Sequence, residues 1–259
     1  MRTIDGRDTA CAHNAACFSR HEVVDHYRSV VSERLYPFEE RFIHNAGVVI
    51  EDAQVLDLGC GAGREAIALA TLGAHVTAVD VSRPMLREAK IAARAARMNV
   101  ELVLSDCLRL RYAANRFDLI LGTHNFISHV LTRDMRVQFM KRCARWLKKS
   151  GRMILTYHNR RGIWHGREYW RGERRRASQL TEKFGLVAEY GDMLVRPSDR
   201  PSYSGPDLVM HLFSHRGFDA EIAAADMKTV LRRCITTLCA PSTQVPWSRT
   251  VTFVACARS

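Results

Sequence analysis

The chain has few of the features that mark secreted, metal-binding or membrane proteins. None of its eight cysteines forms a CxxC pair, and no histidine-rich segment supplies the spacing of a zinc site. No apolar run approaches the roughly 20 residues that a membrane-spanning helix needs. Residues 1–20 have no apolar core after their basic residues, so they do not resemble a secretory signal. These absences favour a cytoplasmic protein with reduced cysteines, no metal site and no membrane partner.

Lysine is also scarce. The net charge is +12, but only six of the 39 basic residues are lysines and thirty-three are arginines. Arginine suits the recognition of phosphate and carboxylate through its planar fork. The arginines are spread along the whole chain, however, so charge alone does not establish a nucleic-acid partner.

Most of the chain follows an alternating pattern of strands and helices. The 259 residues suffice for one large domain with an appended subdomain. Strands bounded by short turns and alternating with helices predict an α/β fold with a doubly wound, mostly parallel sheet. The predicted strands are 54–59, 75–81, 100–106, 116–122 and 152–158, and the predicted helices are 63–73, 82–98 and 133–151.

The remaining segments divide the chain further. We expect a flexible N-terminus at 1–20 and a helical lid at 21–47, where Pro37 separates two helices. The cofactor-binding domain would comprise 48–159 and 215–259, ending in a helix and two strands. Between its two parts lies an inserted cap at 160–214, which contains a predicted hairpin formed by 185–196 and 207–214.

A glycine-rich turn follows the first strand, in VLDLGCGAG at 55–63. A dinucleotide fold requires G-x-G-x-x-G, but here Arg64 stands where the third glycine should be. Asp57 ends the strand two residues before the first glycine, where a carboxylate would repel a pyrophosphate and attract a cation. S-adenosylmethionine carries a sulfonium and an ammonium group and no phosphate. The charges therefore favour it as the cofactor.

Two more carboxylates follow the next two strands. Asp80 ends the second strand, where it suits hydrogen bonding to ribose hydroxyls. Asp106 ends the third strand, where it can accept a hydrogen bond from an adenine amino group. Met85 and either Cys107 or Leu108 are candidates to enclose the adenine ring. The three carboxylates converge on the edge of the sheet at which doubly wound folds bind ligands.

These motifs resemble the class I (Rossmann-like) S-adenosylmethionine-dependent methyltransferase family. The resemblance covers roughly residues 25–160, with VTAVDVS at 76–82, FDLILG at 117–122 and LKKSGRMIL at 147–155, and the terminal strand 249–258 matches the family's closing antiparallel strand. It implies seven strands and a helical lid in which Tyr27 and Tyr36 line the site. The cofactor-binding residues expected together are Tyr27, Asp57, Gly59, Gly61, Gly63, Asp80, Val81, Met85, Asp106, Cys107 and Thr123.

The acceptor chemistry is expected in the loops after the fourth and fifth strands. Methyl transfer from a sulfonium needs alignment and exclusion of water, and it needs a general base only when the acceptor must lose a proton. THNF at 123–126 is not the NPPY-type motif of amino methylation on bases and glutamine. The candidate catalytic residues are His124, Asn125, His129, Tyr157 and His158.

Residues 160–176 hold seven arginines, two tryptophans and a tyrosine. They fit a solvated helix packed on the sheet, a lid that recruits an acidic small molecule, or an RNA-binding patch. The leading interpretation is a small-molecule methyltransferase acting at N or O, with specialised metabolism as one setting. An RNA methyltransferase is an alternative that we do not favour, because no separate RNA-binding domain is visible. An aminocarboxypropyl transferase or cyclase, and a non-enzymatic regulator, also remain open.

Overall fold

The computed structural model describes residues 6–32, 34–160, 173–195, 206–239 and 251–259. Its main sheet has seven strands in the order β3-β2-β1-β4-β5-β9-β8. The strands are β1 (Gln54–Leu58), β2 (His75–Asp80), β3 (Val100–Leu104), β4 (Phe117–Gly122), β5 (Leu147–His158), β8 (Met227–Cys234) and β9 (Val251–Arg258). The first five strands pair in parallel, and β9 runs antiparallel to both β5 and β8. The predicted doubly wound, mostly parallel sheet is confirmed.

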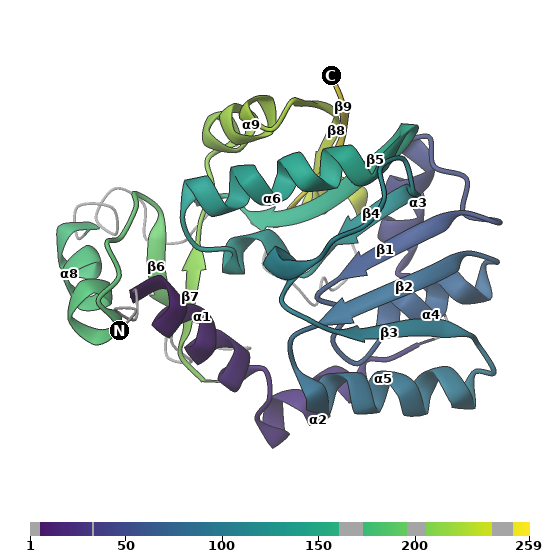
Figure 1. The fold of residues 1–259 in the computed structure, drawn as a ribbon, viewed down its shortest axis with the longest axis horizontal. Helices are drawn as coiled ribbons and strands as arrows, with labels where there is room; N and C mark the ends of the chain where they lie inside the picture. The colour runs from purple at the N-terminus through teal and green to yellow at the C-terminus, as the bar shows by residue number, and fades with distance from the viewer. Residues whose placement is uncertain (1–5, 33, 161–172, 196–205, 240–250) are drawn as a thin grey trace.

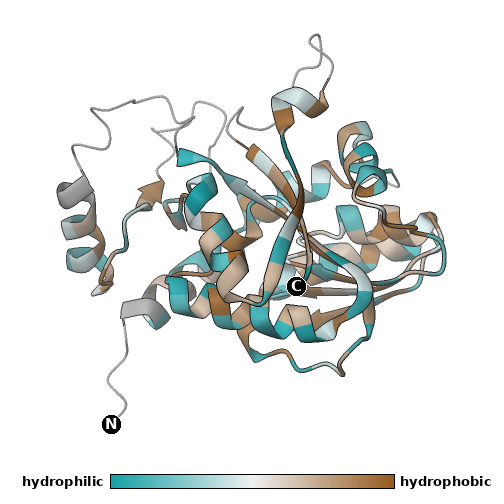
Figure 2. Ribbon diagram, turned by 90° about the horizontal axis from the view of Figure 1, so that it is seen from above, coloured by the Kyte–Doolittle hydropathy of each residue, from teal (hydrophilic) through white to brown (hydrophobic). Residues whose placement is uncertain are grey.

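Helices cover both faces of this sheet (Figure 1). On one face lie α3 (Pro37–Asn45), α4 (Arg64–Thr71), α5 (Arg83–Ala95) and α10 (Ile235–Leu238), and on the other lie α6 (Arg133–Trp146) and α9 (His215–Ala224). Each face has its own buried apolar cluster, and Figure 2 shows apolar residues along the central strands. The helix α2 (His21–Ser29) packs on α5 through Val23, Val24 and Met85. Among the described residues, no helix is long and apolar enough to cross a bilayer.

The helix predicted over 133–151 is too long. In the structure α6 ends at Trp146, and the next residues begin β5. Leu147 is buried and pairs with Phe117 of β4, so its burial in the sheet outweighs the helical pattern of the basic residues that follow. Gly151 packs so closely on the Phe117 carbonyl oxygen that an added Cβ would lie 2.9 Å from it.

The prediction of a flexible N-terminus is wrong for residues 6–17, which form the helix α1 (Gly6–Cys17). Asn14 explains the difference because it anchors the helix to β7 (Leu208–His211). Its amide donates to the Val209 carbonyl oxygen at 2.7 Å and accepts from the Val209 N–H at 3.0 Å. Ser82 stabilises the turn that follows α1, because its hydroxyl donates to the Phe18 carbonyl oxygen at 3.1 Å. A local sequence pattern could not reveal partners so distant in the chain.

We expect Asn14→Ala to release α1 from the rest of the molecule. Asn14 is 4% exposed, and its loss leaves the buried N–H and C=O groups of Val209 without their partners. An unpaired buried polar group costs about 1–3 kcal/mol. Hydrogen exchange followed by mass spectrometry should show faster exchange in α1 and β7, and the exposed Thr9→Ala on the same helix is the control. Unchanged exchange in Asn14→Ala would contradict this anchoring role.

The segment between β5 and α9 contributes a helix and a small separate sheet. The helix is α8 (Glu173–Phe184), and β6 (Asp192–Val195) pairs antiparallel with β7. The predicted hairpin is therefore present, although its strands are shorter than expected. Most of the arginine-rich segment 160–176, with both tryptophans, lies outside the described residues. We refer to the described part, 173–195 and 206–213, as the cap.

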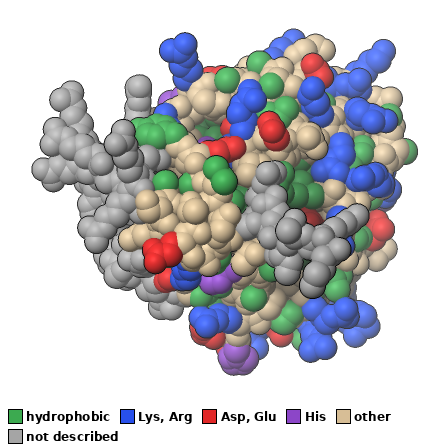
Figure 3. Space-filling view, turned by 60° about the vertical axis from the view of Figure 1, so that its left-hand side comes forward, with side chains coloured by type: hydrophobic (Ala, Val, Ile, Leu, Met, Phe, Trp, Pro, Cys, Tyr) green, Lys and Arg blue, Asp and Glu red, His purple; other side chains and the backbone are tan. Residues whose placement is uncertain are grey.

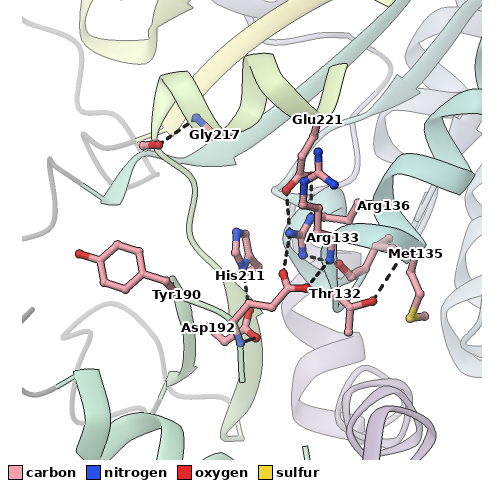
Figure 4. A network of polar contacts seen from close by, with 12 residues as sticks. Thr132, Arg133, Met135, Arg136, Tyr190, Asp192, His211, Gly217 and Glu221 are labelled. Carbon is pink, nitrogen blue, oxygen red and sulfur yellow. Dashed lines mark hydrogen bonds and ion pairs between the residues drawn. The ribbon is translucent and has the colours of Figure 1, made fainter. Parts of the chain in front are cut away.

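One buried arginine joins the cap to the main domain (Figure 4). Arg136 on α6 is 0% exposed and donates to both carboxylate oxygens of Glu221 on α9 at 2.8 Å. The same guanidinium donates to Glu189 at 3.0 Å. Beyond Glu189, His211 and Asp192 pair across the small sheet at 2.7 Å. Burial opposes the charge on Arg136, but the two carboxylates outweigh it and raise the pKa of Arg136.

Candidate active site

The glycine turn after β1 brings the chain close to two neighbouring elements. Gly59 and Gly63 have φ values of 69° and 90°, which favour glycine. A Cβ on Gly59 would lie 2.8 Å from the Phe126 ring, and one on Gly63 would lie 3.0 Å from the Ala89 Cβ. The turn is therefore shaped by backbone freedom and by close packing. Gly63 leads directly into α4.

Asp80 supports this turn from the end of β2. Its carboxylate accepts from the Gly61 N–H and from the Ser82 N–H, both at 2.8 Å. Burial raises the pKa of Asp80, and these backbone donors offset part of that rise. The predicted ribose-binding carboxylate thus also fixes the shape of the glycine turn.

Asp57 has a buried carboxylate oxygen without a hydrogen-bond partner among the described residues. It is 2% exposed at the end of β1, and this oxygen is its Oδ2. Burial, followed by the nearby carboxylate of Glu65, raises the pKa of Asp57 well above its usual range. A buried acceptor of this kind is costly unless something donates to it. The site is therefore suited to a ligand with a cationic donor, as the sequence predicts.

Next to Asp57 lies a buried ionic cluster around Arg64, the first residue of α4. Its guanidinium donates to both carboxylate oxygens of Glu39 on α3 at 2.9 and 2.7 Å, and to Glu65 at 2.6 Å. The Tyr36 ring packs on it, with the guanidinium carbon 4.3 Å from the ring centroid. Burial would raise the pKa of Glu65, but Arg64 and His124 outweigh it and lower that pKa. The cluster joins helix α3 to the glycine turn.

Sequence reasoning missed Glu39, Arg64 and Glu65 as site residues. Arg64 was noticed only as the residue that replaces a third glycine. A usable signal was present, because an Arg–Glu pair opens a helix whose other residues are almost all apolar. A charged pair at such a buried position needs an internal partner, and that partner, Glu39, lies on a separate helix.

The other predicted cofactor residues lie around the glycine turn and differ in how deeply they are buried. Tyr27 packs over it, since a Cβ on Gly61 would lie 3.7 Å from the Tyr27 ring. Asp106 caps a short 3-10 helix by accepting from the Leu108 N–H at 2.8 Å. Met85 is buried beneath α2 and Cys107 packs against the core, whereas Val81 is exposed. Burial of Met85 under Val23 and Val24 reduces the surface that it can offer to an adenine ring.

The loop after β4 has an unusual backbone. His124 and Asn125 have φ values of 50° and 62°, a left-handed conformation that non-glycine residues adopt at some cost. The Asn125 N–H donates to the Thr156 hydroxyl of β5 at 2.8 Å, and its side-chain amide lies 3.1 Å from His158 Nε2. Asn125 Oδ1 is buried without a partner among the described residues. Strain of this kind occurs preferentially at functional sites.

His124 connects this loop to the ionic cluster. Its Nε2 lies 3.0 Å from a Glu65 carboxylate oxygen and 3.0 Å from an Arg64 nitrogen. The hydroxyl of Thr123 donates to the same Glu65 oxygen at 2.5 Å. The structure therefore brings together His124, Thr123 and the glycine turn, as predicted from the sequence.

The two other acceptor candidates lie elsewhere. His129 contacts the N-terminal segment, where its ring meets that of Phe18 edge to face with centroids 5.2 Å apart. Tyr157 faces the α9 side of the sheet, and this position corrects its predicted role beside the acceptor. It is fully buried, stacks on Phe218 and lies 2.7 Å from His215. Successive residues of a strand face opposite sides of a sheet, so Thr156 meets the β4 loop and Tyr157 the core.

Two groups of potential metal ligands occur among the described residues. They are Glu39, Glu65 and His124, and Glu189, Asp192 and His211, each with ligand atoms within 4.8 Å of one another. Arg64 donates to both carboxylates of the first group, and Arg136 donates to Glu189 of the second. These carboxylates already bind guanidinium groups, which repel a metal cation.

Comparison with known proteins identifies a family to which part of the chain is similar. Residues 55–151 match the family model described as a methyltransferase domain. A ubiquinone biosynthesis O-methyltransferase from Bradyrhizobium diazoefficiens is 36% identical over 107 residues, covering 41% of this chain and 40% of the relative. The chain therefore spans less than half the length of that relative.

Solved structures match over more of the chain. An S-adenosylmethionine-dependent methyltransferase from Methanosarcina mazei superposes with a TM-score of 0.64 at 23% identity, covering 87% of this chain and 98% of that one. A 1,6-didemethyltoxoflavin-N1-methyltransferase from Burkholderia thailandensis, solved with 1,6-didemethyltoxoflavin and S-adenosylhomocysteine, gives 0.62 at 17% identity, covering 96% and 88%.

The fold is that of the class I S-adenosylmethionine-dependent methyltransferases. Residues 55–151, the part that matches the methyltransferase-domain model, contain the strands β2 to β4 and most of β1. The glycine turn, Asp57, Asp80, Asp106 and the strained loop after β4 all fall inside this part.

Proposed function

We propose that this chain binds S-adenosylmethionine and transfers its methyl group to an oxygen or nitrogen of a small-molecule acceptor. When bound, S-adenosylmethionine supplies an electrophilic methyl group on a sulfonium. The observation that carries the proposal is the buried, unpartnered Oδ2 of Asp57 beside the glycine turn. The names of the relatives, which include O- and N-methyltransferases of small molecules, support the choice of acceptor class.

The charges around the turn fit a cationic ligand. Asp57 interacts electrostatically with three other carboxyl groups, those of Glu65, Asp80 and Glu39. It also interacts with the guanidinium of Arg64. Burial raises the pKa values of Asp57, Asp80 and Glu39, so ionising these carboxyl groups costs free energy when no cation is near. A ligand with an ammonium and a sulfonium would lower that cost.

Each side chain would then have a separate task. Asp57 would hold the ammonium of the cofactor, Asp80 its ribose hydroxyls and Asp106 its adenine amino group. Tyr27 would cover the glycine turn and exclude water from the reacting groups. Exclusion of water strengthens each of these polar contacts.

Basic side chains of the described residues do not by themselves mark a nucleic-acid acceptor. On the face shown in Figure 3, many of the described Lys and Arg side chains gather toward its right-hand side, with a few acidic side chains elsewhere. A phosphate-binding surface would concentrate them along a track.

The affinity for the cofactor should depend on pH through Asp57. Its raised pKa means that the free protein holds a proton there at pH values where an ordinary aspartate is ionised. A cationic ligand favours the ionised form, so binding releases the proton. Calorimetry with S-adenosylhomocysteine, which keeps the ammonium, should show affinity rising with pH and levelling off above the raised pKa. Asp57→Asn should bind weakly and with a flatter pH dependence; an unchanged affinity would contradict the proposal.

The product identifies the reaction. Incubation with S-adenosylmethionine and a panel of phenols, catechols and amines should yield S-adenosylhomocysteine, detected by mass spectrometry. Methylthioadenosine in its place would indicate transfer of the aminocarboxypropyl group and would overturn methyl transfer.

A further inference from the structure

The loop after β4 and the ionic cluster meet at a single side chain, His124. Three elements surround it: Tyr27 on α2, Glu39 on α3, and Arg64 with Glu65 on α4. The Tyr27 ring packs over the glycine turn and also meets the His124 ring edge to face, with centroids 6.3 Å apart. His124 therefore lies beside the turn that the proposed function assigns to the cofactor.

The number of hydrogens on the Arg64 guanidinium indicates whether His124 Nε2 accepts a hydrogen bond from Arg64 or donates one to Glu65. The Arg64 nitrogen that lies 3.0 Å from His124 Nε2 carries two hydrogens. Two carboxylate oxygens approach it more closely, that of Glu39 at 2.7 Å and that of Glu65 at 2.6 Å. Both hydrogens of Arg64 are therefore taken. Glu65, whose carboxylate oxygen lies 3.0 Å away, is then the acceptor to which Nε2 of His124 can donate, and this tautomer places the lone pair of the neutral ring on Nδ1.

Glu65 is built to receive that hydrogen. It is buried, and its pKa is lowered because Arg64 and His124 outweigh the effect of burial. The Thr123 hydroxyl donates at 2.5 Å to the Glu65 oxygen that lies beside His124, and Arg64 donates to this oxygen as well. These two donors fix the position of the carboxylate. An ionised carboxylate that orients a histidine ring and stabilises its protonated form is a recurring arrangement for a general base.

The exposure and backbone of His124 also suit a reacting group. Its side chain is 27% exposed, whereas that of Glu65 is 6% exposed. Glu65 therefore lies in the interior, and His124 lies closer to the surface. The left-handed backbone of His124, with φ at 50°, is strained. Arg64 and Glu65 hold the ring in that conformation from the first turn of α4.

We propose that His124 is the general base of this methyltransferase, that Glu65 is its positioning residue, and that the acceptor carries a hydroxyl or ammonium proton. This inference rests on the proposed function. The acceptor proton moves to Nδ1 of His124, and the resulting imidazolium is paired with Glu65. The electron pair of the acceptor oxygen or nitrogen then bonds to the methyl carbon, the methyl–sulfur bond breaks and its electron pair stays on sulfur.

The first test uses the free protein and needs no acceptor. In protein labelled with ¹⁵N-histidine, long-range ¹H–¹⁵N spectra report which ring nitrogen carries hydrogen, and His124→Asn identifies the His124 signals. We expect hydrogen on Nε2 in the neutral ring, and a mixture of both tautomers in Glu65→Gln. Hydrogen on Nδ1 in the wild-type protein would overturn the proposal. Should Glu65→Gln fail to fold, Thr123→Val can be used in its place, because it removes only one donor to Glu65. It should produce a smaller shift toward the other tautomer.

The second test measures turnover with catechol, phenol and benzylamine as probes. His124→Asn should lower kcat by about 10²- to 10⁴-fold, the usual contribution of a general base. Glu65→Gln should lower kcat more than it changes KM. The exposed His75→Asn, at the opposite edge of the sheet, is the matched control and should behave as the wild type.

Calorimetry with S-adenosylhomocysteine separates the two proposals. Wild-type protein that fails to bind this compound would contradict the proposed function itself. Binding retained in both proteins, with His124→Asn turning over as fast as the wild type, would overturn the general base alone. Retained binding with the expected loss of kcat would support both.

Discussion

Arg136→Ala is expected to lower the free energy of unfolding by about 3–5 kcal/mol, the usual cost of breaking a buried ion pair from one side. Arg136 is fully buried and is the shared partner of Glu221 on α9 and Glu189 in the cap. Its loss leaves the Glu221 carboxylate buried without its guanidinium. Urea denaturation followed by circular dichroism measures the change, provided that unfolding is two-state.

A neighbouring arginine on the same helix provides the control. Arg133 is exposed, and it holds Glu189 only through its backbone N–H at 2.7 Å, which alanine keeps. Arg133→Ala should change stability by less than about 0.5 kcal/mol. The double variant Arg136→Met with Glu221→Leu should recover part of the loss, because no unpaired charge remains between α6 and α9. Equal stability of Arg136→Ala and Arg133→Ala would show that the pair does not hold these helices together.

Asp80→Ala is expected to weaken cofactor binding by roughly 30- to 150-fold, which corresponds to about 2–3 kcal/mol for a charged hydrogen-bonding group. Two effects combine in this loss. The carboxylate would no longer bind the ribose hydroxyls, and the Gly61 and Ser82 N–H groups would lose the acceptor that holds the turn. Calorimetric titration with S-adenosylhomocysteine measures the affinity.

Asp80→Asn separates these two effects. An amide oxygen can still accept from a backbone N–H, so the turn should keep more of its shape, whereas the negative charge is lost. We expect an affinity between those of the wild type and Asp80→Ala. The exposed Asp134→Ala on α6 should bind as the wild type does. Wild-type affinity in Asp80→Ala would contradict the assignment of this edge of the sheet to the cofactor.

The parts of the molecule that the sequence predicts well depend on local patterns. Apolar strand patterns bounded by turns predicted β1, β2 and β4 within one or two residues. The carboxylates of Asp57 and Asp80 were found because the strands are parallel, which places their ends at one edge. Local order along the chain is enough for inferences of this kind.

The parts that the sequence did not predict depend on distant partners. Glu39 and Arg64 lie 25 residues apart and meet only after α3 packs over the turn. The side of the sheet that Tyr157 faces follows from the exact register of β5, which the pattern TYHN does not specify. Helix α6 ends at Trp146 because the next residues pair with β4, a tertiary effect that overrides helix propensity.

The anchoring of α1 also constrains the order in which the protein can be assembled. Asn14 and Val209 are 195 positions apart, so α1 is synthesised long before the strand that supplies its hydrogen-bond partners. Closing so long a loop is slow compared with forming the local strand–helix units. We therefore expect α1 to dock late, after the sheet has formed. A nascent chain stalled before residue 209 would leave α1 accessible to proteases and chaperones.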